Sequence, residues 1–290
     1  MTPTFAAPAP LLVLGATSLI GRYLLADLRS QDRPFVAISR KPPADGGSEW
    51  LRDDLTRDGL TGRLPRAEVA LSLSPIWLLP PALPALAAAG VKRIVAFSST
   101  SRATKANSPV AEERAVAARL AAGEDQTASF CEANGITWTV LRPTLIYSEG
   151  EDANVSRLAS LIRRFQVLPL SGFGGGLRQP VHAGDLAQAA LAVIEREPTF
   201  NRTYDLPGGE TLTYRVMAER VFEGLGRTPR IVTVPPPLWR FGLKLMGSRL
   251  PGATAAMGSR MGEDLAFDPA PARRDFDWSP RPFRPIFATR

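Results

Sequence analysis

The sequence has almost none of the residues on which several common kinds of site depend. Its 290 residues include one cysteine, Cys131, and one histidine, His182. A single cysteine excludes an internal disulfide and fits a reducing, cytoplasmic compartment. A single histidine excludes a multi-histidine metal centre, so we expect no metal site. A Ser-His-Asp triad would have to use that one histidine.

Runs of cations and of unbroken apolar residues are also lacking. The net charge is +7, but the 35 basic residues are spread along the chain, which predicts no nucleic-acid partner. Residues 1–10, MTPTFAAPAP, have neither a basic nor an apolar segment, so we expect a disordered lead-in rather than a signal peptide. The uncharged stretch 69–91 contains four prolines, which would break a membrane-spanning helix.

Short apolar runs alternate with helical patterns over the first half of the chain. Such alternation predicts a parallel sheet with helices on both faces. The expected strands are residues 11–15, 34–39, 68–74, 93–99 and 136–143, and the expected helices follow the first strand and cover 82–90 and 110–135. We therefore expect an α/β fold, a doubly wound parallel sheet of the Rossmann type, with a smaller C-terminal substrate lobe.

The texture of the sequence changes after Pro143, where glycine-rich and proline-rich stretches become common. This predicts a Rossmann domain over residues 11–145 and the smaller lobe over 146–290. Part of the second half, about 179–206, is expected to return to the first domain.

The stretch LLVLGATSLIGRYLL, residues 11–25, has the pattern of a strand, a turn and a helix. In such a unit the backbone amides of the turn and the start of the helix hold a dinucleotide pyrophosphate. Gly15 permits the tight turn and leaves space for the pyrophosphate, and Gly21 lets the helix pack closely on the strand. Ser18 stands where a middle glycine is often found, and its hydroxyl can reach phosphate. Glycine spacing alone also occurs in structural turns, but this context favours a cradle formed by Gly15, Thr17, Ser18, Leu19, Ile20 and Gly21.

The end of the second strand predicts which dinucleotide is bound. An acidic residue there would bind a ribose 2′-hydroxyl, whereas this chain has Ser39, Arg40 and Lys41. Because a guanidinium can grip a 2′-phosphate bidentately, NADP(H) is favoured over NAD(H). The predicted adenine contacts are Asp54 and Leu55, and the remaining predicted cofactor contacts, at the ends of later strands, are Ser74 and Pro143.

Several short motifs, in order along the chain, resemble the extended and atypical short-chain dehydrogenase/reductases, which include sugar-nucleotide epimerases and dehydratases. They are GATSLIG (15–21), DL (54–55), IVAFSS (94–99), LRPTLIY (141–147), QPVHAGDLAQA (179–189) and the closing LAFDPAPARRDFDWSPRPF. The resemblance implies NAD(P) binding by the first half and a small-molecule substrate, a nucleotide sugar or a carbonyl compound, under the second. It also implies that His182 and Asp185 hold the lobe near the pocket rather than catalyse.

Enzymes of this family use a tyrosine and a lysine four residues later, with a serine or threonine after the preceding strand. Ser98, Ser99 and Thr100 supply the hydroxyl type. If Glu124 occupies the place of the family's helix glutamate, the tyrosine and lysine positions are Val116 and Leu120, neither of which can move a proton. The candidate proton sources are then Ser99, Lys105 and Tyr147.

Two functions follow from this departure. One is an oxidoreductase or epimerase/dehydratase relative with atypical chemistry. The other is a protein that binds NADPH without turnover, as a sensor, assembly factor or structural subunit, like the nucleotide-binding accessory subunit of respiratory complex I. The basic amphipathic stretch 235–250 fits a helix of the lobe better than a membrane surface or a docking site, so a membrane surface is not expected as a partner. A homodimer is left open.

Overall fold

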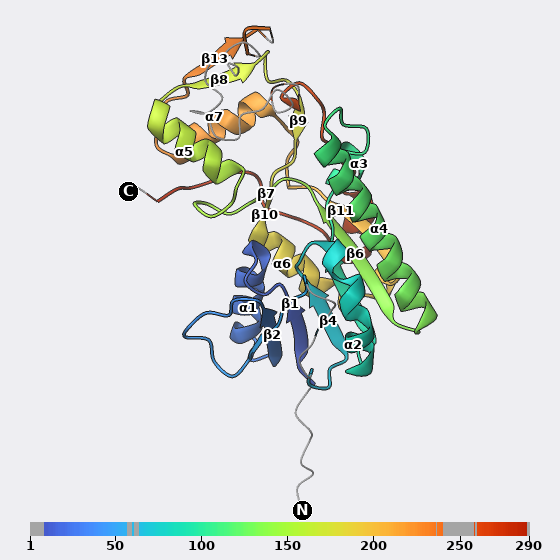
Figure 1. Ribbon diagram of the computed structural model, residues 1–290. Helices are drawn as coiled ribbons and strands as arrows, with labels where there is room; N and C mark the ends of the chain where they lie inside the picture. The colour runs from blue at the N-terminus through green and yellow to red at the C-terminus, as the bar shows by residue number, and fades with distance from the viewer. Residues whose placement is uncertain are drawn as a thin grey trace, which may run out of the picture. The chain divides into compact units, whose positions relative to one another are not determined.

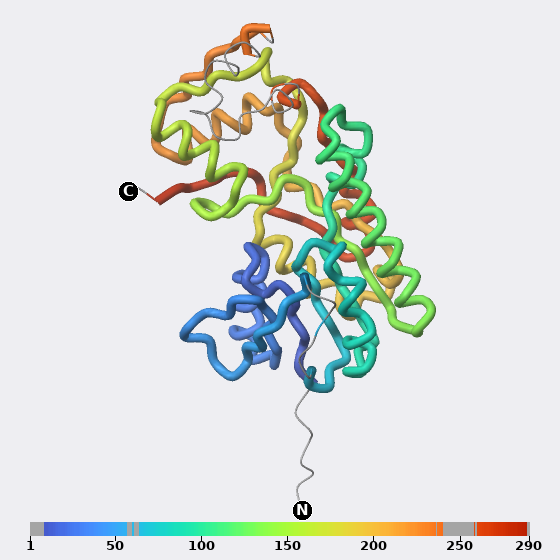
Figure 2. Tube along the Cα trace, viewed as in Figure 1, coloured from blue at the N-terminus to red at the C-terminus, as the bar shows by residue number. Residues whose placement is uncertain are grey.

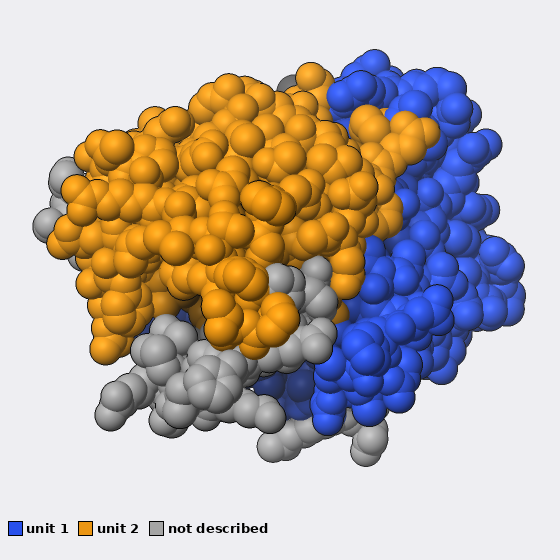
Figure 3. Space-filling model, turned by 90° about the horizontal axis from the view of Figure 1, so that it is seen from above, with its two compact units in different colours: residues 1–143, 184–205, 270–278 blue, residues 144–183, 206–269, 279–290 orange. Residues whose placement is uncertain are grey.

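The computed structural model describes residues 9–56, 60, 64–235, 237–239, 258 and 260–288. The chain forms two compact units, coloured blue and orange in Figure 3. Unit 1 contains Met1–Pro143, Gly184–Asp205 and Ala270–Trp278, and unit 2 contains Thr144–Ala183, Leu206–Pro269 and Ser279–Arg290. The prediction from the sequence had the chain return to the first unit over about 179–206, and it did not include the second return at residues 270–278.

Unit 1 contains a seven-stranded sheet, which confirms the predicted fold class (Figure 1). Its strand order is β11-β6-β5-β4-β1-β2-β3, and the pairs from β3 to β6 are parallel. The strands are β1 (Leu11–Leu14), β2 (Phe35–Ser39), β3 (Trp50–Arg52), β4 (Val69–Ser72), β5 (Arg93–Phe97), β6 (Thr137–Pro143) and β11 (Arg202–Leu206).

Helices cover both faces of this sheet because its central strands are apolar on both sides. Leu12, Leu14 and Ile94 pack in one core with residues of α2 and α4, while Figure 1 shows α1 and α6 on the other face. The helices of unit 1 are α1 (Leu19–Ser30), α2 (Leu83–Ala88), α3 (Ser101–Thr104), α4 (Ala111–Ala133), α6 (Ala183–Ala192) and α10 (Ala270–Phe276), with 3₁₀ turns η1 (Ile76–Leu78), η2 (Pro80–Ala82) and η3 (Glu197–Thr199).

A buried arginine on β5 fixes the end of α6. Arg93 is 5% exposed and donates to the backbone carbonyls of Val193 (2.8 Å) and Ile194 (3.0 Å) and to Thr139 Oγ1 (2.6 Å). Burial lowers the pKa of its guanidinium to about 10, which still leaves it charged at neutral pH. The last turn of α6, drawn in yellow in Figure 2, is thereby held against the sheet of its own unit.

Unit 2 has its own core, which in the described part of the chain is built by two helices and three two-stranded ladders. Tyr147, Ile162, Phe222 and Phe283 are buried in this core. The ladders pair β10 with β7, β12 with β9 and β13 with β8. The elements are β7 (Ile146–Tyr147), α5 (Val155–Phe165), β8 (Leu168–Ser171), β9 (Leu177–Arg178), β10 (Val181–His182), β12 (Leu212–Thr213), α7 (Tyr214–Gly224) and β13 (Ile231–Val234).

The expected helix over 235–250 lies largely outside the described residues, since the structure does not describe 236 or 240–250. Among the residues that it does describe, no helix combines the length and the apolar composition needed to cross a membrane.

Candidate functional site

The turn after β1 uses its serine to start a helix. Ser18 has extended backbone angles (φ −67°, ψ 166°), and its Oγ accepts a hydrogen bond from the Gly21 amide at 3.1 Å. It is therefore the N-cap of α1, a role for which serine is well suited. Because that bond uses a lone pair, the proton of the hydroxyl is still available to an anion at the helix start.

The two glycines of the turn are required by the protein's own packing. Gly15 has φ +70°, and a Cβ there would lie 2.4 Å from Ser74 Oγ and 2.8 Å from the Ser74 amide nitrogen. A Cβ on Gly21 would lie 2.2 Å from the carbonyl oxygen of Ala16. The expectation that a side chain at position 15 would fill space reserved for a pyrophosphate is thus corrected, because it would first strike the loop after β4.

The end of β2 forms a polar corner beside this turn. The hydroxyls of Thr17 and Ser39 are 2.9 Å apart, and the Lys41 amide donates to Ser39 Oγ at 3.3 Å. The side chain of Arg40 is 65% exposed, and its Nε lies 3.9 Å from Asp54 Oδ1. Asp54 also accepts hydrogen bonds from the amide and hydroxyl of Thr56.

One cavity of about 210 Å³ gathers most of the predicted cofactor residues. Leu19, Ile20 and Gly21 are in the first turn of α1, and Pro143 ends β6; none of these four lines the cavity. The predicted residues that do line it are Gly15, Thr17, Ser18, Ser39, Arg40, Asp54, Leu55 and Ser74. The lining residues that were not predicted are Ile38, Asp53, Thr56, Leu73, Pro75 and Leu78. Pro75 could have been predicted from the sequence, because it directly follows the end of the strand expected over residues 68–74.

Of the three hydroxyl residues that follow β5, Ser98, Ser99 and Thr100, two donate their proton to acceptors within the protein. Ser98 donates to Glu124 Oε1 at 2.5 Å, and Thr100 donates to the carbonyl oxygen of Pro143 at 3.1 Å. Ser99 Oγ accepts from the Ser101 amide at 3.1 Å, and no acceptor for its own proton is found among the described residues. Ser99 is therefore the hydroxyl of this group that keeps a proton to donate.

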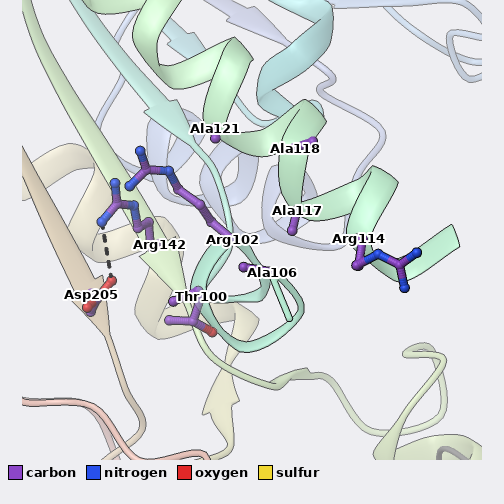
Figure 4. A pocket seen from close by; sticks show the side chains of 10 residues that line it. Thr100, Arg102, Ala106, Arg114, Ala117, Ala118, Ala121, Arg142 and Asp205 are labelled. Carbon is purple, nitrogen blue, oxygen red and sulfur yellow. Dashed lines mark ion pairs between the residues drawn. The ribbon is translucent and has the colours of Figure 1, made fainter. Parts of the chain in front are cut away.

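The helix glutamate inferred from the sequence, Glu124, lies at the centre of an ion-pair cluster. It is 5% exposed and accepts from Arg142 Nε at 3.0 and 3.2 Å, while Arg102 Nε lies 3.3 Å from its Oε2. Arg142 also approaches Asp205 at 4.0 Å, the pair drawn with a dashed line in Figure 4. Burial raises the pKa of the Asp205 carboxyl above its ordinary value, against the opposing effect of Arg142.

This cluster borders a second cavity, of about 340 Å³, which the sequence did not predict. Figure 4 shows alanines of α4 on one side of it and the Arg142–Asp205 pair on the other. It is lined by Thr100, Arg102, Ala103, Ala106, Arg114, Ala117, Ala118, Ala121, Arg142 and Asp205. Arg102 and Arg142 are paired with Glu124 and Asp205, whereas Arg114 donates to the carbonyl oxygen of Ser108.

The positions inferred for the family's tyrosine and lysine contribute to the core of unit 1. Leu120 is 3% exposed and packs with the strands, and Val116 packs against the same core. Neither side chain presents a group that can accept or donate a proton. Lys105 is half-buried and follows α3 at the Ser99 side of the same unit.

Tyr147 belongs to unit 2 and is only 1% exposed. Its ring makes edge contacts with His182 at 5.2 Å and Phe283 at 5.0 Å. His182 Nε2 lies 3.4 Å from Glu149 Oε2. Burial opposes ionisation of Glu149, but hydrogen bonds from His182 and from the backbone outweigh it and hold the pKa of this carboxyl below its ordinary value.

Asp185 and Cys131 are both buried in unit 1, Asp185 in the first turn of α6. Burial raises the pKa of the Cys131 thiol to about 12, so the thiol is protonated and unreactive at neutral pH.

Residues 81–206 match the model of the NAD dependent epimerase/dehydratase family. Over 101 residues the chain is 29% identical to the mitochondrial NADH dehydrogenase [ubiquinone] 1 alpha subcomplex subunit 9 of Arabidopsis thaliana, which covers 34% of this chain and 25% of that protein. The subunit of the same name from Dictyostelium discoideum is 23% identical over 122 residues, 39% of this chain and 34% of that protein. The matches thus span between about a quarter and a third of these relatives' own length.

Solved structures share the fold over nearly the whole chain. MoeE5 in complex with UDP-glucuronic acid and NAD has a TM-score of 0.72 and 20% identity, over 94% of both chains. The UDP-glucose 4-epimerase of Thermotoga maritima with UDP-glucose has a TM-score of 0.69 and 16% identity, again over 94% of both chains. Together these findings confirm the resemblance inferred from the motifs.

Proposed function

From the relationship of this chain to the extended and atypical short-chain dehydrogenase/reductases, we propose that unit 1 binds a nicotinamide adenine dinucleotide, NADP(H) in preference to NAD(H). The observation that carries the proposal is the 210 Å³ cavity, because residues from four separate stretches of the sequence line it together. A dinucleotide bound there would supply hydride exchange, and the residues around it would hold and orient it.

Each part of the cavity has chemistry that suits one part of the ligand. The start of α1, with the Ser18 proton, suits the pyrophosphate. The hydroxyls of Thr17 and Ser39 and the exposed guanidinium of Arg40 suit a 2′-phosphate. Asp54 and Leu55 offer a polar acceptor and an apolar surface to the adenine.

Titration calorimetry with NADPH and NADH tests this proposal directly. The folded protein should bind both dinucleotides and should bind NADPH more tightly. If neither NADPH nor NADH bound at millimolar concentration, on protein shown to be folded by circular dichroism, the proposal that this cavity holds a dinucleotide would be refuted.

For the reaction, we propose an atypical oxidoreductase in which Ser99 is the first candidate proton donor, with Lys105 and Tyr147 as the others. Support comes from the free proton of the Ser99 hydroxyl, whereas Tyr147 is enclosed by its own core. The substrate class carried by the resemblance is a nucleotide sugar or a carbonyl compound. MoeE5 and the Thermotoga maritima epimerase are named with such sugars.

A non-catalytic role is the second candidate, and the aliphatic residues Val116 and Leu120 favour it. The two curated relatives are named as subunits of a NADH dehydrogenase, so a protein partner is the class to seek under this alternative. A cytoplasmic location and a homodimer stay predictions from the sequence, and both relatives are named mitochondrial.

A further inference from the structure

The net charge of the chain is divided very unevenly between its two units. Unit 2 contains 15 basic and 9 acidic residues, a net charge of +6, whereas unit 1 contains 20 and 19, a net charge of +1. Most of the net positive charge of the chain therefore belongs to unit 2, although the basic residues are spread along the sequence.

Exposed apolar side chains gather in the same unit, at the end of α5 and along the β8–β13 ladder. Phe173 is 82% exposed, Val232 52%, Phe165 42% and Val167 37%. Val232 pairs in register with Pro169, which is also exposed, and Val167 lies two residues before Pro169, directly before β8. Because side chains alternate along a strand, these three point away from the core of unit 2 on one face of the ladder.

Arginines lie between these apolar residues. The guanidinium of Arg164 stands 5.1 Å from the centre of the Phe165 ring. Arg215 donates to the carbonyl oxygen of Phe173 at 3.1 Å and to the Thr233 hydroxyl at 2.9 Å. Arg230 is exposed and directly precedes β13, two residues before Val232.

These arginines are not neutralised by the protein. In the part of the chain that the structure describes, neither Arg164, Arg215 nor Arg230 forms an ion pair with a carboxylate. Arg220 and Arg284 of the same unit, by contrast, both bind Glu210. Arg164 and Arg230 are thus among the cations that contribute to the positive charge of unit 2.

We propose that this basic–apolar face, formed by Arg164, Phe165, Val167, Pro169, Phe173, Arg230 and Val232, docks on the surface of an anionic lipid membrane. Lipid phosphates complement the guanidinium groups, and the boundary of the acyl chains accepts rings and aliphatic side chains that protrude between them. An acidic protein would satisfy the arginines but would need an apolar pocket of matching shape to cover Phe173, whereas the acyl boundary of a membrane accepts an exposed ring without such a pocket. The sequence did not indicate a membrane because the face joins residues 164–173 with residues 230–232, two stretches that are far apart along the chain.

The proposal is tested by flotation of the full chain with vesicles of phosphatidylglycerol and phosphatidylcholine, against vesicles of phosphatidylcholine alone. The protein should float with the anionic vesicles only, and added salt should release it. Arg164→Gln with Arg230→Gln should lower the partition coefficient about thirtyfold, since each arginine near such a surface is worth about fivefold. Phe173→Ser with Val232→Ser should lower it about tenfold.

A matched control removes two charges from exposed positions of unit 1, Arg66→Gln with Lys92→Gln, and should leave flotation unchanged. Binding to poly-L-glutamate distinguishes a lipid surface from an acidic polypeptide. The double substitution Phe173→Ser with Val232→Ser should weaken binding to vesicles but not binding to poly-L-glutamate. Flotation that is equal for all variants, or poly-L-glutamate binding without flotation, would overturn the proposal. Thermal unfolding of each variant shows that it is folded.

Discussion

At the residue scale, Ser18 explains how the turn tolerates the loss of its middle glycine. The backbone at this position is in the extended region that any residue adopts, so no glycine is needed there. The serine instead caps α1, a contribution of about 1 kcal/mol to a helix. Gly15 and Gly21 cannot be replaced in this way, because a Cβ at either would meet backbone atoms of the same unit.

Arg40 is the residue on which the choice between NADPH and NADH depends. It is mostly exposed and only loosely approached by Asp54, so it can turn toward a 2′-phosphate at little cost. We expect Arg40→Ala to weaken NADPH binding by about 1–3 kcal/mol, the range for a hydrogen bond to a charged group, and to leave NADH binding nearly unchanged. Calorimetry measures both, with Arg66→Ala as the control for lost charge. Equal losses for the two dinucleotides would show that Arg40 does not read the phosphate.

At the element scale, local pattern was sufficient for the core strands and the first turn. The buried runs of β1, β2, β4, β5 and β6 and the long α4 were predicted within a few residues. The joining of β11 to β6 was not predicted, nor was the role of α10, where Asp275 accepts a hydrogen bond from the Tyr204 hydroxyl at 2.6 Å. Contacts between segments 71 residues apart leave no periodic signal in either segment. The 340 Å³ cavity was missed for the same reason.

The packing of helix α4 predicts what happens when a lysine is placed at position 120, the position inferred for the family's lysine. Leu120 is buried among the strands, so Leu120→Lys would place an ammonium group in an apolar core. We expect this change to destabilise the protein by more than about 3 kcal/mol and to create no activity. Urea unfolding measures the loss, and Arg119→Lys, one position away, is the control. A stable Leu120→Lys protein with new turnover would mean that position 120 faces the cofactor.

Helix α7 is tied to the last segment of unit 2 by one carboxylate. Glu210 binds Arg220 and Arg284 and accepts the Phe283 amide at 2.9 Å. Burial opposes its ionisation, but these partners outweigh it and lower the pKa of Glu210 below 4.5. A depressed folded pKa contributes stability that is present above the unfolded value and is lost as pH falls through the folded value.

Glu210→Gln should therefore cost about 1–2 kcal/mol of unfolding free energy at neutral pH, where the charged hydrogen bonds are complete. The cost should shrink as the pH falls from 4.5 through the lower pKa of the folded protein, because the carboxyl is protonated first in the unfolded chain and then in the folded one. Urea unfolding at a series of pH values measures both effects. Glu195→Gln, on an exposed side chain of unit 1, is the control. A cost that is independent of pH would indicate that the side chain matters through its shape alone.

At the scale of the whole molecule, the fold is shared with MoeE5 and with the UDP-glucose 4-epimerase of Thermotoga maritima, while the positions inferred for the family's tyrosine and lysine hold Val116 and Leu120. Proton transfer by a positioned side chain is typically worth about 10²–10⁴ in rate, so binding and positioning are left with little acid–base catalysis. We expect little or no reduction of ordinary ketones and no sugar-nucleotide epimerisation at rates usual for the family.

Any turnover that is found should fall sharply with one of Ser99→Ala, Lys105→Met or Tyr147→Phe. Consumption of NADPH with a panel of carbonyl compounds and nucleotide sugars measures it, and unchanged NADPH affinity in each variant separates lost chemistry from lost folding. Rapid turnover that was unchanged in all three variants would contradict the assignment of Ser99, Lys105 and Tyr147 as the candidate proton donors. Either the positions inferred on α4 for the tyrosine and lysine would then be wrong, or the proton would come from unit 2, where His182 and Tyr214 would be the next residues to replace.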